Sequence, residues 1–150
     1  MTPLTPPAPP EFTSLSNFLL GIPWQPPLPP IATLDPQLVN IYYGRLTSSM
    51  SDPPILSQMA PLLNAWSAIT AQPREEWPTL FNAQILNNPT LWPPAQQIVL
   101  AWYTGVCGSN LPRTPDLYER TLVWLLAQAH PMGVPLAFGY WQYPPSGANP

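Results

Sequence analysis

The chain has 150 residues and a net charge of −3; 26 residues are proline and only 7% are charged, whereas about a quarter of an ordinary soluble domain is charged. It contains no lysine and only four scattered arginines, which excludes the basic stripe that nucleic-acid binding requires. Apolar residues make up 45% of the chain, which excludes compositional disorder, and no apolar run reaches the roughly 18 residues that a transmembrane helix needs.

The N-terminal part alternates between extended and helical patterns. Residues 1–10 (MTPLTPPAPP) predict an extended polyproline-type linker. In residues 11–21 (EFTSLSNFLLG) apolar side chains recur at helical spacing, and Gly21 is a suitable end for this short amphipathic helix. Residues 23–30 (PWQPPLPP) predict a second extended stretch.

Two aspartate–proline pairs predict the starts of the next helices. Asp35 followed by Pro36 combines a capping side chain with a proline in the first helical position, and Asp52 followed by Pro53 repeats the combination. Apolar residues at helical spacing follow each pair. Pro61 lies inside the second helix and is expected to kink or split it.

Three further helices are predicted downstream. Residues 74–87 place acidic side chains in the first turn, where the helix dipole favours them. Residues 93–104 give the clearest helical pattern of this part, and Gly105 closes it. The last predicted helix, residues 114–128, begins with a threonine cap followed by proline.

The predicted fold class is all-α: a single small helical domain with long proline-rich connections and an irregular C-terminal tail. The linker covers residues 1–10, the helical domain residues 11–128 and the tail residues 129–150. The tail is rich in proline and glycine, and its aromatic side chains must pack on the domain or on a partner. These side chains are Phe138, Tyr140, Trp141 and Tyr143.

Few residues are available for catalysis. Cys107 and His130 form the only possible Cys–His pair, and Cys107 follows a helix end, where nothing obvious lowers a thiol pKa. One cysteine and one histidine make a zinc site improbable. The glycine-rich sequences that bind dinucleotides or nucleoside triphosphates are absent. We therefore expect no catalytic, cofactor-binding or metal-binding residue in this chain.

Aromatic enrichment combined with few charges is typical of the core of a protein interface. The alternative is a globular protein whose surface consists of Asn, Gln, Ser and Thr. The aromatic residues near the end of the chain can be either core residues or interface anchors, and those of the tail favour the interface because the tail has few intrachain partners. The candidate interface residues are Trp102, Tyr103, Tyr118, Tyr140, Trp141 and Tyr143.

Three stretches of sequence resemble one protein family. Residues 97–108 (QIVLAWYTGVCG), 117–124 (LYERTLVW) and 139–145 (GYWQYPP) are similar to the small (gamma) subunit of membrane-bound FAD-dependent sugar and polyol dehydrogenases. This family includes the small subunits of gluconate, sorbitol, fructose and glucose dehydrogenase complexes. The opening FTSLSNFLLG also resembles the first helix of that family.

Several features depart from the family pattern. Thr121 replaces the usual alanine, and residues 135–138 lack the cysteine that family members often carry shortly before the final aromatic residues. If that cysteine bridges subunits in relatives, this chain cannot do so at that place. The twin-arginine export signal of the family is also absent, and the middle of the chain matches only weakly.

The resemblance implies a role in a complex. In that family the large subunit carries FAD and the chemistry, and a cytochrome c subunit passes electrons to the membrane quinone. The small subunit holds no cofactor and helps the large subunit to fold, load FAD and cross the membrane. The implied location is the periplasm, membrane-associated through the complex, if an export signal was removed or is carried by the partner, and the cytoplasm otherwise.

Two alternatives stay open. The first is a free-standing binding module whose proline-rich segments recognise another protein domain. The second is a small enzyme that uses Cys107 as its nucleophile.

Overall fold

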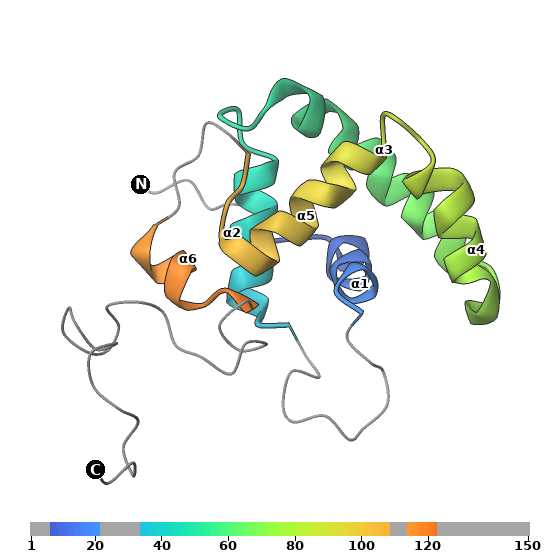
Figure 1. Ribbon diagram of the computed structural model, residues 1–150, viewed down its shortest axis with the longest axis horizontal. Coiled ribbons are helices and arrows are strands. Elements are labelled where there is room, and N and C mark those ends of the chain that lie inside the picture. Colours follow the sequence, from blue (N-terminus) through green and yellow to red (C-terminus); the bar gives the residue numbers. More distant parts are fainter. Residues whose placement is uncertain (1–6, 22–33, 109–113, 123–150) are drawn as a thin grey trace, which may run out of the picture.

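The computed structural model describes residues 7–21, 34–108 and 114–122, and this part of the chain is built from helices without a strand (Figure 1). The predicted all-α fold class is therefore confirmed. The 3-10 turn η1 (Arg74–Glu76) precedes α4, and the π-helical turn η2 (Asn82–Leu86) continues it. The α-helices of the described residues are α1 (Pro10–Leu19), α2 (Pro36–Leu46), α3 (Pro53–Thr70), α4 (Trp77–Phe81), α5 (Trp92–Thr104) and α6 (Pro115–Glu119).

Both aspartate–proline pairs begin helices, as predicted. At the start of α2, Oδ1 of Asp35 accepts a hydrogen bond from the backbone N–H of Gln37 at 2.8 Å. Helix α3 begins at Pro53, but the side chain of Asp52 makes no capping hydrogen bond. This carboxylate lies instead beside the loop after α5, since a Cβ added to Gly108 would come within 3.2 Å of its Oδ2. The loop after α5 therefore packs on the start of α3.

Pro61 does not split α3, which runs without a break for 18 residues. Proline at this position lacks the N–H that would bond the carbonyl of Ser57, four residues earlier. Ser57 and Pro61 are both exposed, so water can hydrogen-bond the freed carbonyl. Solvent replaces the lost bond on the outer face of the helix, and the buried face stays continuous.

Residues 74–87 are largely helical, as predicted, but their hydrogen-bond pattern changes along the segment. Pro78 has no N–H to donate to the carbonyl of Arg74. That carbonyl instead accepts the N–H of Trp77, which gives the 3-10 geometry of η1. After α4 the helix widens into the π-helical turn η2. One predicted helix is therefore three short elements.

Helix α5 ends where predicted, whereas α6 ends early. Gly105 closes α5 with a left-handed φ of 73°, a conformation that glycine adopts at no steric cost. Helix α6 stops at Glu119 instead of continuing through its predicted length. The hydroxyl of Thr121 donates to the carbonyl of Tyr118 at 2.9 Å, which competes with a helical hydrogen bond. The predicted remainder, residues 123–128, lies outside the described residues.

Two aromatic centres lie in the described core, and a further ring pair, Phe12 with Tyr43 at 5.1 Å, joins α1 to α2. Helix α5 packs on α1, α2 and α3 (Figure 1) and carries Trp102 of the second centre. In the first centre, Trp66 of α3 is fully buried, with its ring centroid 4.8 Å from that of Phe18. In the second, the rings of Tyr42 and Trp102 meet edge to face at 4.8 Å. We call the first centre the Trp66 cluster; its members are Phe18, Trp66, Trp77 and Phe81.

The end of the predicted linker packs on the helical body. The backbone N–H of Ala8 donates to Oδ1 of Asn40 at 2.9 Å, and Ala8 is partly buried against the core. Helix α1 already begins at Pro10. The tail, residues 129–150, lies outside the described part of the chain, so the division at residue 128 remains a prediction.

Candidate partner interface

Trp102 lies inside the protein. Its side chain is 1% exposed, and the fully buried Tyr42 packs against it. Of the two roles predicted for Trp102, core residue or interface anchor, the structure places it in the core.

Two of the predicted interface residues keep partial exposure within the described chain. Tyr103 lies near the C-terminal end of α5, and Tyr118 lies on α6. Both side chains are available at least in part to another protein. Tyr140, Trp141 and Tyr143 lie outside the described residues, so their place at an interface remains a prediction.

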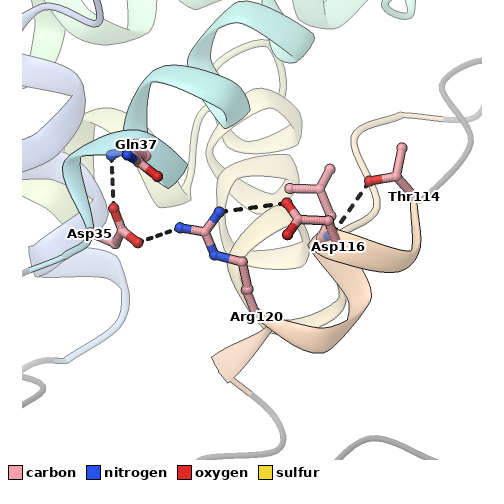
Figure 2. Close-up of polar contacts among 6 residues, drawn as sticks. Asp35, Gln37, Thr114, Asp116 and Arg120 are labelled. Atoms are coloured by element: carbon pink, nitrogen blue, oxygen red, sulfur yellow. Dashed lines mark hydrogen bonds and ion pairs between the residues drawn. The ribbon is translucent and has the colours of Figure 1, made fainter. Parts of the chain in front are cut away.

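Helix α6 contacts the body through the buried Leu117 and through the ion pair of Arg120 with Asp35 at the start of α2. The other polar contacts in Figure 2 are local to α2 or to α6. Leu117 is 2% exposed, and its N–H donates to the hydroxyl oxygen of Thr114 at 3.4 Å, which caps the helix. Nη2 of Arg120 donates to Oδ2 of Asp35 at 2.5 Å, and its Nη1 lies 3.5 Å from Oδ2 of Asp116. Because Asp35 also caps α2, one carboxylate joins the start of α2 to the end of α6.

Cys107 does not have the surroundings of a reactive thiol. The residue is fully buried, and burial raises the pKa of its thiol to about 11. The guanidinium of Arg45 acts in the opposite direction but does not outweigh burial. At neutral pH the thiol is protonated, which is the unreactive form. His130, its predicted alternative partner, lies outside the described residues.

The α-helices share an unusual feature at their N-termini. Each of the six in the described chain has proline at its first or second position. Helix N-termini bind phosphate groups through free backbone N–H donors, and proline has none. Proline in the first turn removes one of about four free N–H donors and fixes the backbone for the start of the helix. Across the described residues, His, Cys, Asp and Glu also form no group of three that could hold a metal ion.

The long helices expose a surface without charge. Neither α3 nor α5 contains a charged residue, and between Asp52 and Arg113 only residues 74–76 are charged. A soluble domain normally carries mixed charges over its surface, and depletion of charge is typical of interface cores. The large apolar side chains exposed on or beside these helices are Met50, Leu56, Leu86, Leu100 and Val106.

These aliphatic residues were not among the predicted interface residues, which were all aromatic. The signal that could have found them is the absence of charge from residues 53–73 and 77–112. A helix that is half exposed in an isolated domain would be expected to carry charges on its outer face. The absence of charged residues from α3 and α5 therefore makes the outer faces of these helices suitable for contact with another protein.

The chain matches the model of a known protein family. The family described as membrane bound FAD containing D-sorbitol dehydrogenase matches residues 1–135. The chain belongs to this family. The match includes every described residue, and it extends through the middle of the chain, where the motif resemblance was weak. No curated protein and no solved structure matches the chain.

Family membership associates the chain with an oxidoreductase that contains FAD. The resemblance predicted from the AWYTG and LYE motifs is confirmed at the level of the family. The family is described as membrane bound, and within the described residues no helix is long and apolar enough to cross a membrane.

Proposed function

We propose that the chain is a non-catalytic accessory subunit that binds and stabilises the FAD-containing large subunit of a sugar or polyol dehydrogenase. The observation that carries this proposal is the family match over residues 1–135, because the family description names both FAD and a dehydrogenase. In the proposed complex the large subunit holds FAD and supplies the redox chemistry. This chain supplies binding surface.

The chemistry of the described residues supports a role without catalysis. Cys107 is buried, and its thiol is protonated at neutral pH. In the part of the chain that the structure describes, His, Cys, Asp and Glu form no group of three that could hold a metal ion.

The surface supports a protein partner. The charge-free outer faces of α3 and α5 expose Leu56 and Leu100, and Tyr103 and Tyr118 add partly exposed aromatic rings. An obligate interface is more apolar than an ordinary protein surface. The aromatic content of the chain is weaker support for a partner surface than was expected from the sequence. Trp66, Trp102 and Tyr42 are buried in the core of the chain itself.

Mass action explains how such a subunit would act. A protein that binds the folded large subunit and not its unfolded form stabilises it, by about 2.7 kcal/mol when present at 100 times the dissociation constant. This stabilisation would favour folding, FAD loading and export of the large subunit. We also propose that a cytochrome c subunit joins through the complex and that the complex works in the periplasm.

A free-standing binding module is the second candidate. The observation that favours it is the closed core: the Trp66 cluster and the Tyr42–Trp102 pair bury their rings within one chain. A chain with such a core can fold before it meets a partner. The two candidates differ in whether the chain is needed by a flavoprotein.

Co-expression of the large dehydrogenase subunit with and without this chain tests the proposal. We expect the two chains to co-purify, with flavin absorbance at about 370 and 450 nm. In cells that lack this chain, we expect a lower yield of large subunit that is both soluble and loaded with FAD. The opposite outcome is a chain that purifies alone, soluble and colourless, while the large subunit loads FAD without it. That result would contradict the accessory role and favour the binding module.

A further inference from the structure

We propose that Asp35 and Arg120 form a latch that positions α6, and with it Tyr118, for the large subunit. The inference rests on the proposed function, because it assigns part of the partner surface to α6. It adds that the partner surface at α6 is assembled by a contact between residues 85 positions apart in the sequence. Arg120 would act as a positioning residue.

Helix α6 needs such a contact because it is short. It has five residues, and helices of fewer than about twelve residues are not stable by themselves. Among its described side chains Leu117 is buried, and Thr121 directly after the helix is 3% exposed. Leu122 is partly buried against the core as well. The position of α6 therefore depends on apolar contacts and, in addition, on the latch.

The Asp35 carboxylate and the Arg120 guanidinium are each held in position by a second hydrogen-bonding partner. Oδ1 of Asp35 is held by the backbone N–H of Gln37 at the start of α2, which leaves Oδ2 facing Arg120. On the other side, Asp116 holds the guanidinium from the same helix turn. The N–H of Gln37, with Arg120, lowers the pKa of the Asp35 carboxyl, so the latch is ionised at neutral pH.

The latch also lies close to the second aromatic centre. The charges of Arg120 and Asp116 are near enough to influence the hydroxyl of Tyr42, whose pKa burial raises to about 12. The ring of Tyr42 packs on Trp102 in α5. Helix α6 is therefore tied to the start of α2, whose Tyr42 packs on the helix that also carries Tyr103.

The expected effect is moderate. A single exposed ion pair changes an equilibrium by a factor of about one to five, and a charge-assisted pair held by further hydrogen bonds contributes more. The side chains of Arg120 and Asp35 are 30% and 42% exposed, so solvent screens them in part. Loss of the latch is expected to raise the undocked population of α6 about five- to tenfold.

The variants Arg120→Ala and Asp35→Asn test the latch in the full chain. Asparagine caps a helix as well as aspartate does, so Asp35→Asn removes the charge and keeps the start of α2. Arg74→Ala is the matched control, because it removes an exposed arginine at η1, distant in sequence from the latch. Hydrogen exchange measures docking of α6, and titration with purified large subunit measures binding.

We expect both latch variants to speed exchange of the α6 amides about five- to tenfold and to weaken partner binding by a similar factor, with unchanged thermal unfolding of the body. The double variant should exchange no faster and bind no more weakly than either single variant. Arg120→Lys should keep part of the docking of α6 that Arg120→Ala loses, and Arg74→Ala should change neither exchange nor binding.

Unchanged exchange in Arg120→Ala would overturn the latch. Faster exchange with unaltered binding would overturn the role of α6 in the interface, while the accessory function would stand. If the wild-type chain binds no large subunit, the proposed function fails, and exchange still reports on the latch.

Discussion

The Trp66 cluster and α6 are held in place by different forces. Trp66 is fully buried and meets aromatic rings from α1 and α4. Helix α6 rests on Leu117 and on the ion pair between Arg120 and Asp35, at the surface. The first region depends on packing, and the second depends in part on charge.

This difference predicts two levels of stability in one chain. Burial of a large apolar side chain contributes about 1.5–3 kcal/mol, whereas a partly exposed ion pair contributes about 0–1 kcal/mol. The body around Trp66 is therefore expected to unfold as one unit. Helix α6 is expected to open locally at a smaller free-energy cost, which suits a segment that must adapt to a partner.

Truncation of Trp66 gives the largest expected effect. We expect Trp66→Ala to lower the free energy of unfolding by about 3–5 kcal/mol, because it leaves a cavity between α1, α3 and α4. Urea denaturation followed by circular dichroism measures this change. The control is Leu56→Ala on the same helix, where the side chain is 38% exposed and a change below about 1 kcal/mol is expected. Equal effects of the two variants would show that Trp66 is not a centre of the core.

Truncation of Leu117 tests whether α6 can detach while the body around Trp66 stays folded. We expect Leu117→Ala to weaken docking of α6 by about 2–3 kcal/mol, seen as faster amide exchange in residues 116–121. The midpoint of urea unfolding of the body should change little. Leu100→Ala on α5 is the control, because that side chain is 38% exposed and its truncation should leave docking of α6 unchanged. A large drop in global stability would mean that α6 and the body are a single cooperative unit.

Alkaline pH tests a third place in the core, the buried thiol of Cys107 in the loop after α5. Burial raises the pKa of Cys107 from 9.0 to about 11, so the folded chain holds a proton that the unfolded chain releases at lower pH. The stabilising contribution is complete below pH 9 and is lost as the pH rises towards 11. We expect a loss of at most about 3 kcal/mol, measured as the urea midpoint between pH 7 and 11. In Cys107→Ala the decline over this range should be shallower; an identical decline would contradict the assignment to Cys107.

Features that depend on neighbouring residues could be predicted from the sequence. The cap at Asp35 and the helix end at Gly105 follow from short-range backbone chemistry, and the all-α class follows from the spacing of apolar residues. The uninterrupted helix at Pro61 could not be predicted, because it depends on exposure of the freed carbonyl. The early end of α6 depends on the rotamer of Thr121.

The candidate interface was predictable only in part. The sequence left Trp102 open between core and interface, because an aromatic residue on an apolar helix face suits both, and only its packing on Tyr42 decides. The pair of Asp35 and Arg120 is separated by 85 residues, and neither position has a local pattern that signals the other. Charge depletion, by contrast, was visible in composition, and it could have been located on α3 and α5 from the sequence alone.

The burial of Cys107 has a practical consequence for labelling chemistry. It is the only cysteine of the chain, and its buried, protonated thiol should react slowly with maleimides while the chain is folded. A variant such as Ser57→Cys, on the exposed face of α3, would therefore accept a fluorophore at a single site without removal of the native cysteine. Assembly with a partner could then be followed by fluorescence on a chain whose core is unaltered.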